Sequence, residues 1–194
     1  MMPGNKNLET LTRSGIRVFT NLAKATPDCR MLTIGEPDLP TPEPIKRAAM
    51  KALEEGQTHY APNQGTLSLR AAIAAFETRR GRNTTPEEVL VTVGATQALY
   101  TALTGILNPG DQVVIPTPAF SLYDTITTAA GAESVFLDVS KTDFQITRQS
   151  LAGCLTEKTK AIVLNSPCNP TGVILNRESL EAVREAVLER DLYL

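Results

Sequence analysis

The sequence has little of what several large functional classes require. Its formal net charge is −2, from 19 Lys and Arg against 21 Asp and Glu, and it has no long run of one sign. We therefore expect no nucleic-acid partner and no attraction to an anionic membrane. No apolar segment is long enough to span a bilayer, and the first ten residues lack the apolar stretch of a signal peptide. These absences favour a cytoplasmic protein.

Histidine and cysteine are also scarce. His59 is the single histidine, and no Asp, Cys or second His stands near it in the sequence. It therefore has neither a zinc ligand set nor a triad partner, and we expect no metal site. The cysteines are odd in number and far apart, which indicates reduced, mostly buried thiols; they are Cys29, Cys154 and Cys168.

Apolar residues make up 42% of the 194 residues, enough for a real core. From residue 88 onward, short β-rich runs alternate with helical patterns. The runs are 89–93, 112–115, 133–139 and 160–164, and the helical patterns are 96–106, 121–130, 148–155 and 177–189. This alternation indicates an α/β fold with a largely parallel sheet and helices on both faces.

The sequence before residue 88 reads differently. Helices are predicted at 7–26, 42–55 and 66–80, with a short strand at 31–34. Thr41 is the predicted cap of the second helix, and Gly56 is its predicted stop. At the other end, residues 191–194 begin a further strand. Because a stop there leaves a strand edge and helix faces uncovered, we expect a truncated chain.

Residues 91–99 predict a strand, a turn of small residues and the start of a helix. Such a turn directs several backbone N–H groups at one point, with the helix dipole behind them. Gly94 and Ala95 allow a ligand to approach closely, and the Thr96 hydroxyl can donate a hydrogen bond. The pattern is typical of a phosphate cup and is neither a P-loop nor a dinucleotide fingerprint. An ordinary tight turn is the alternative.

Three other loops carry candidate side chains. In Asn-Ser-Pro-Cys-Asn-Pro-Thr-Gly at 165–172, the prolines would fix Asn169 as a rigid amide donor for an aromatic hydroxyl or oxyanion. Phe120 follows a strand and could stack on a flat heteroaromatic ring. The Tyr60 hydroxyl could reach a phosphate oxygen. The alternatives are a polar turn that caps the next helix, a core phenylalanine and a surface tyrosine.

Taken together and in this order, these strings resemble class I and II aminotransferases of fold type I, the aspartate-aminotransferase-like group that uses pyridoxal 5'-phosphate (PLP). The matching stretches are 35–38 with 41–42, 60–62 with 65 and 69–70, 94–99, 108–111 and 165–172. The resemblance implies an incomplete PLP-dependent transferase fold, amino acid and 2-oxo acid substrates, and a homodimer. It implies an N-terminal arm and small-domain contribution at 1–42 and the first part of the large PLP-binding domain at 43–194.

The resemblance also implies roles for residues of the cofactor site. Gly94, Ala95 and Thr96 would bind the PLP phosphate, and Phe120 would stack on the pyridine ring. Asn169 would donate a hydrogen bond to the phenolic oxygen of the cofactor. Many relatives carry Trp or Tyr at the position of Phe120, which leaves substrate preference open.

Other implied roles concern the substrate, the partner subunit and catalysis. Tyr60 would reach the phosphate of the neighbouring subunit, and Gly35 would line the substrate carboxylate side. The Schiff-base lysine and the Asp that pairs with the pyridinium nitrogen would lie beyond residue 194, so no catalytic residue is assigned and the chain alone should be nearly inactive. The alternatives are a fold-type-I lyase, such as a carbon–sulfur lyase, and a non-catalytic remnant that binds PLP weakly.

Overall fold

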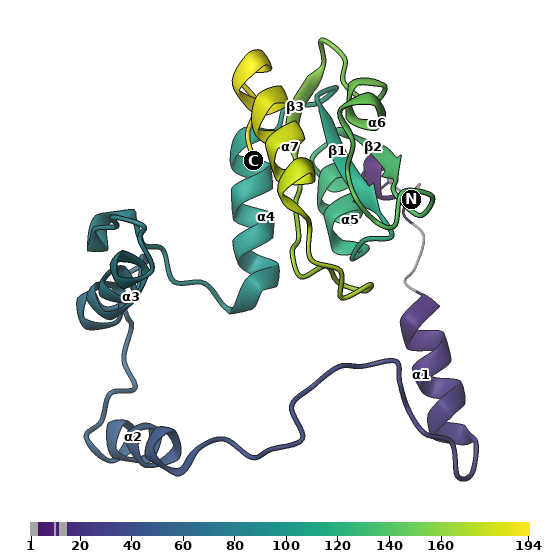
Figure 1. The fold of residues 1–194 in the computed structure, drawn as a ribbon. Helices are drawn as coiled ribbons and strands as arrows, with labels where there is room; N and C mark the ends of the chain where they lie inside the picture. The colour runs from purple at the N-terminus through teal and green to yellow at the C-terminus, as the bar shows by residue number, and fades with distance from the viewer. Residues whose placement is uncertain (1–3, 10, 12–14) are drawn as a thin grey trace. The chain divides into compact units, whose positions relative to one another are not determined.

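The computed structural model describes residues 4–9, 11 and 15–194 (Figure 1). The chain divides into two compact units. One unit combines residues 1–12 with 93–194, and the other spans 13–92. The sheet and its helices belong to the first unit. The domain boundary expected after residue 42 stays a prediction.

Within the described residues, the sheet has three parallel strands in the order β2-β1-β3. They are β1 (Gln112–Thr117), β2 (Glu133–Asp138) and β3 (Thr159–Ile162). Because the strands are parallel, their carboxyl ends meet at one edge, where ligands bind in open α/β sheets. The further strand expected near the end begins beside β3, since Tyr193 forms a parallel bridge with Ala161.

The side chains of β1 alternate between two apolar cores, as the two-residue period of a strand requires. Val113 and Ile115 share a core with residues of α4 (Gly94–Ile106) and α5 (Leu122–Ala129). Val114 lies in a second core with residues of α6 (Arg148–Ala152) and α7 (Arg177–Arg190). The expected parallel sheet with helices on both faces is therefore confirmed.

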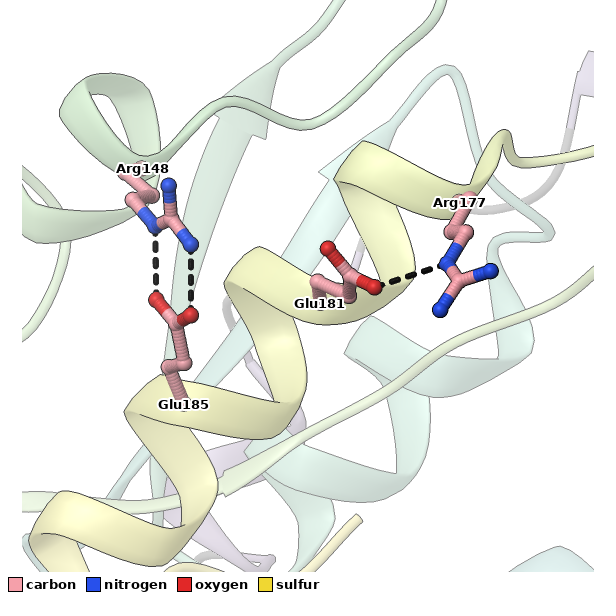
Figure 2. Close-up of polar contacts among 4 residues, drawn as sticks. All are labelled: Arg148, Arg177, Glu181 and Glu185. Carbon is pink, nitrogen blue, oxygen red and sulfur yellow. Dashed lines mark hydrogen bonds and ion pairs between the residues drawn. The ribbon is translucent and has the colours of Figure 1, made fainter.

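An ion pair joins α6 to α7 on the outer surface of the second core (Figure 2). The Arg148 guanidinium donates two hydrogen bonds to the Glu185 carboxylate, with Nε 2.6 Å from Oε2. Within α7, Arg177 Nε donates to Glu181 Oε1 over 2.8 Å. All four residues are exposed, so water screens both pairs and the buried core provides most of the packing energy.

The other unit contains α1 (Gly15–Ala25), α2 (Glu43–Glu54), α3 (Leu67–Arg79) and the 3₁₀ turn η2 (Pro86–Glu88). The helices α2 and α3 confirm the predictions at 42–55 and 66–80. Gly56, with φ of 72°, ends α2 as predicted.

Two local predictions at these helices need correction. Thr41 does not cap α2, because Pro42 occupies the cap position without a side-chain hydrogen bond. In place of one helix at 7–26, the structure has the 3₁₀ turn η1 (Lys6–Leu8) in the first unit and α1 in the second. Residues 10 and 12–14 of that predicted helix lie outside the described residues.

Two predicted strands were wrong. Residues 31–34 and 89–93 form no strand, although their composition favours one. A strand needs a neighbour along its length to satisfy its backbone hydrogen bonds. Leu32 is instead 94% exposed, and the Val91 N–H donates to the carbonyl oxygen of Gln64 over 3.0 Å.

Candidate functional site

The chain enters α4 through a glycine in the left-handed region. Gly94 has φ of 76°, and a β-carbon built there would meet no atom within 4 Å, so the need for glycine is conformational. The Val93 N–H donates to Gln97 Oε1 over 2.6 Å and closes the turn. Gly94, Ala95 and Thr96 are exposed, and the first turn contains no acidic residue. Backbone N–H groups at the positive end of a helix, with no acidic residue in the first turn, suit an anion such as phosphate.

The loop after β3 is tied to itself by backbone hydrogen bonds. Asn165 Oδ1 accepts a hydrogen bond from the Asn169 N–H over 2.7 Å. The Cys168 N–H donates to the carbonyl oxygen of Val173 over 2.9 Å, and the Gly172 N–H donates back to that of Cys168 over 2.7 Å. Asn169 itself is exposed, so its amide can meet a ligand outside the loop.

A small cavity lies beneath the loops that follow β1 and β3. Its wall is mostly apolar and includes Pro118, Ala119, Tyr123, Cys168 and Asn169. Its volume is about 30 Å³, enough for a water-sized molecule.

Two side chains connect the walls of this cavity. Cys168 Sγ lies 3.6 Å from the carbonyl oxygen of Pro118, which links the two loops. Burial raises the pKa of the Tyr123 hydroxyl, and the nearby Cys168 raises it further. The hydroxyl therefore stays protonated at neutral pH, and we regard Tyr123 as part of the packing and not as a proton-transfer group.

The structure places Thr96 and Asn169 on two different hollows. Thr96 lines a groove between α4 and α5 together with Leu122, whereas Asn169 lines the small cavity together with Tyr123. Since Leu122 and Tyr123 are consecutive, both hollows lie beside the start of α5. Phe120 lies just before it, half-buried against the first core, with its ring edge-on to Tyr123 at 6.0 Å and 88°. Stacking of Phe120 on a cofactor stays a prediction.

Tyr60 and Gly35 belong to the other compact unit, and both are exposed. Their expected contacts with a partner's phosphate and with substrate stay predictions. Across residues 4–9, 11 and 15–194, no three His, Cys, Asp or Glu side chains are grouped to hold a metal ion. In those same residues, no helix is both long and apolar enough to cross a bilayer.

The cysteines differ in part from expectation. All three thiols are free, but Cys29 is exposed, while Cys154 and Cys168 are half-buried. The expectation of mostly buried thiols was therefore wrong for Cys29, which lies in an open loop after α1. Burial raises the pKa of the Cys154 thiol and keeps it protonated.

Sequence reasoning missed one residue that contacts the loop after β3. Gln145 lies between β2 and α6, and its Oε1 accepts a hydrogen bond from the Asn176 N–H over 2.8 Å. The two residues are 31 positions apart in the sequence. No local pattern signals such a contact, because it depends on how the two crossover segments pack.

Comparison with known proteins identifies the family. The family described as "Aminotransferase class I and II" matches residues 27–194, which include both the start of α4 and the Asn169 loop. The chain belongs to the class I and II aminotransferases. This confirms the resemblance drawn from the ordered motifs.

Named relatives agree with this family. The chain is 37% identical over 192 residues to the probable N-acetyl-LL-diaminopimelate aminotransferase of Bacillus subtilis, covering 98% of this chain and 49% of that relative. It is 39% identical over 194 residues to the aspartate aminotransferase of Pyrococcus abyssi, covering 98% and 50%. The chain thus spans about half the length of these curated relatives.

Solved structures confirm the expected aspartate-aminotransferase-like fold. The aspartate aminotransferase from Thermus thermophilus, solved with maleate, matches with a TM-score of 0.91 and 36% sequence identity. The match covers 100% of this chain and 52% of that one.

Proposed function

We propose that this chain is the cofactor-holding part of a PLP-dependent aminotransferase, which moves an amino group between an amino acid and a 2-oxo acid. The observation that carries the proposal is the family match, because it runs through both candidate ligand-binding segments of the sheet-containing unit. The relatives named above are aminotransferases, and their names favour amino transfer over the lyase alternative.

The described residues fit PLP at two points. The first turn of α4 suits the phosphate, because it is exposed, has no acidic residue and starts at a glycine with open space around it. The exposed amide of Asn169 suits the phenolic oxygen of the ring. When bound, PLP supplies an electron-withdrawing ring that stabilises negative charge at the α-carbon of the substrate.

The chain's own residues would bind and orient this group. The N–H groups of Gly94 and Ala95 and the Thr96 hydroxyl would hold the phosphate, and they fix one end of the cofactor. Asn169 would hold the phenolic oxygen as a hydrogen-bond donor, and the bond from its backbone N–H to Asn165 Oδ1 holds the backbone that carries this donor. Two fixed ends restrict rotation of the ring, which is how a site positions a reacting group. Phe120 would cover one face of the ring.

Other parts of the proposal depend on the resemblance alone. These are the homodimer, the role of Tyr60 at the partner's phosphate, the role of Gly35 at the substrate and the cytoplasmic location. Very low activity of residues 1–194 on their own is a further prediction.

The test measures PLP binding and product formation with the protein expressed from its complete gene. We expect it to retain PLP through gel filtration and to convert a 2-oxo acid into an amino acid at the expense of an amino donor. Release of ammonia or sulfide without amino transfer would favour the lyase. Failure to bind PLP would contradict the proposal, and PLP binding without any turnover would favour the non-catalytic remnant.

A further inference from the structure

The loop that carries Asn169 is held at its far end by the side chain of Gln145. The Oε1 atom of this amide accepts the hydrogen bond of the Asn176 N–H over 2.8 Å. Its Nε2 atom donates to the carbonyl oxygen of Ile174 over 3.3 Å. Both ends of the amide are therefore committed to the last residues of the loop, just before α7 begins.

A buried hydroxyl anchors Gln145 to the start of α7. The Ser179 hydroxyl donates to Gln145 Oε1 over 3.0 Å and accepts a hydrogen bond from the Ile146 N–H over 2.9 Å. Ser179 is fully buried, and its N–H donates to Asn176 Oδ1 over 2.8 Å. The bonds form a closed network among Gln145, Ile146, Asn176 and Ser179. Ser179 and Ile146 are buried and Gln145 is half-buried, whereas Asn176 is exposed, so the bonds at Ser179 form the part of the network best shielded from water.

The hydrogen bonds inside the loop connect this anchor to Asn169. Gln145 bonds to Ile174 and Asn176, which flank Leu175. The Leu175 N–H donates to Ser166 Oγ over 3.0 Å. Val173 is the residue before Ile174, and its carbonyl oxygen accepts a hydrogen bond from the Cys168 N–H. The segment held by Gln145 is thus bonded to the segment that leads directly into Asn169.

The turn that presents Gln145 has an unfavourable backbone. Asp143 and Phe144 have φ of 52° and 58°, so two consecutive non-glycine residues are left-handed. The Thr142 hydroxyl donates to the carbonyl oxygen of Gln145 over 2.5 Å and holds the turn closed. In this conformation Phe144 lines the small cavity together with residues of the Asn169 loop. Strain that the surrounding structure maintains beside a ligand loop is a sign of a functional constraint.

We propose that Gln145 is a positioning residue for the cofactor site, acting through the Asn169 loop. This inference rests on the proposed function and adds a residue to it. Gln145 does not touch the cofactor; it fixes the segment 174–176, and through it the direction in which the Asn169 amide points.

The test compares three variants of the protein expressed from its complete gene. Gln145→Ala removes all three side-chain hydrogen bonds, and Gln145→Glu keeps the acceptor but loses the donor to Ile174. The matched control is Gln112→Ala. Gln112 is also half-buried and bonds to Glu133 and Thr156 through its side chain, over 2.8 Å and 2.6 Å, but at the first residue of β1.

The first readout is the dissociation constant of PLP, measured by fluorescence at a temperature where each variant is folded by circular dichroism. We expect about tenfold weaker binding in Gln145→Ala, a smaller loss in Gln145→Glu and no loss in Gln112→Ala. The second readout is hydrogen exchange without PLP. We expect faster exchange at 168–176 in both Gln145 variants only.

A double mutant separates positioning from general stability. If Gln145 acts through Asn169, then Gln145→Ala should weaken PLP binding much less in an Asn169→Ala background than in the wild type. Unchanged PLP affinity in both Gln145 variants, unchanged loop exchange, an equal loss in Gln112→Ala, or additive losses in the double mutant would overturn the inference. If the wild type binds no PLP, the proposed function fails first and the inference fails with it.

Discussion

The side-chain oxygen of Asn165 accepts a hydrogen bond from the backbone nitrogen of Asn169, 2.7 Å away. This contact closes a turn between residues four positions apart, in the loop that follows β3. We expect Asn165→Ala to reduce the free energy of unfolding by about 1 kcal/mol and to weaken PLP binding. Asn165→Asp keeps the acceptor and should change both much less. Denaturant unfolding and PLP titration check this, and equal effects of the two substitutions would contradict it.

Asn169→Ala should separate cofactor binding from stability. The side chain is exposed, so the free energy of unfolding without PLP should change by no more than about 0.5 kcal/mol. If its amide holds the phenolic oxygen, PLP binding should weaken about tenfold and turnover should fall. Parallel measurements of PLP affinity, turnover and unfolding test this. Unchanged affinity and turnover would remove Asn169 from the site.

The elements around the sheet could be predicted because their signals are local. The runs near β1, β2 and β3 and the helical patterns near α4, α5, α6 and α7 each depend on a period within the segment. The strands predicted at 31–34 and 89–93 failed because a strand also needs a partner, and a single segment does not specify one.

The candidate site residues were also chosen from local signals. Asn169 was proposed because its loop follows a strand and contains prolines, and Thr96 because small residues precede a helix; both roles stay predictions. Gln145 was missed because its hydrogen bonds join residues 29 to 34 positions apart. The separation of Thr96 and Asn169 into two hollows also depends on packing of α5, which no motif encodes.

Alanine substitution at two glycines of α4 should change the stability of the protein in opposite directions. Gly94 has φ of 76°, so Gly94→Ala should destabilise the protein by about 1 kcal/mol and weaken binding of the PLP phosphate. Gly105 lies within the same helix, and a β-carbon there meets nothing within 4 Å, so Gly105→Ala should stabilise by roughly 0.5–1 kcal/mol. Thermal unfolding with and without PLP distinguishes them. The same sign of change in both variants would contradict the account of this turn.

Ser179→Ala should lower the free energy of unfolding, although it removes only one hydroxyl group. The substitution leaves the buried Ile146 N–H without its acceptor at 2.9 Å, and such a loss typically destabilises by about 1–3 kcal/mol. Ser68→Ala is the control, because Ser68 is exposed on α3 and alanine favours a helix. Chemical denaturation of both variants measures the difference. A Ser179→Ala protein as stable as the control would show that the buried network contributes little.

The Arg148–Glu185 pair should make the stability of the protein depend on pH in the acid range. Hydrogen bonding to Arg148 lowers the pKa of the Glu185 carboxyl below its ordinary value. Its contribution is therefore complete above the ordinary carboxyl pKa and is lost as pH falls through the lowered one. Glu185→Gln should remove a small part of the acid sensitivity, and Glu189→Gln, one turn later on α7, is the control. Unfolding followed from neutral pH into the acid range tests this, and identical pH profiles for wild type and Glu185→Gln would contradict it.

The most direct test of the account is a crystal structure of the protein, expressed from its complete gene, with PLP bound. We predict phosphate oxygens within hydrogen-bond distance of the Ala95 N–H and the Thr96 hydroxyl, and the phenolic oxygen within reach of the Asn169 amide. Ordered PLP that contacts neither the start of α4 nor Asn169 would contradict the account.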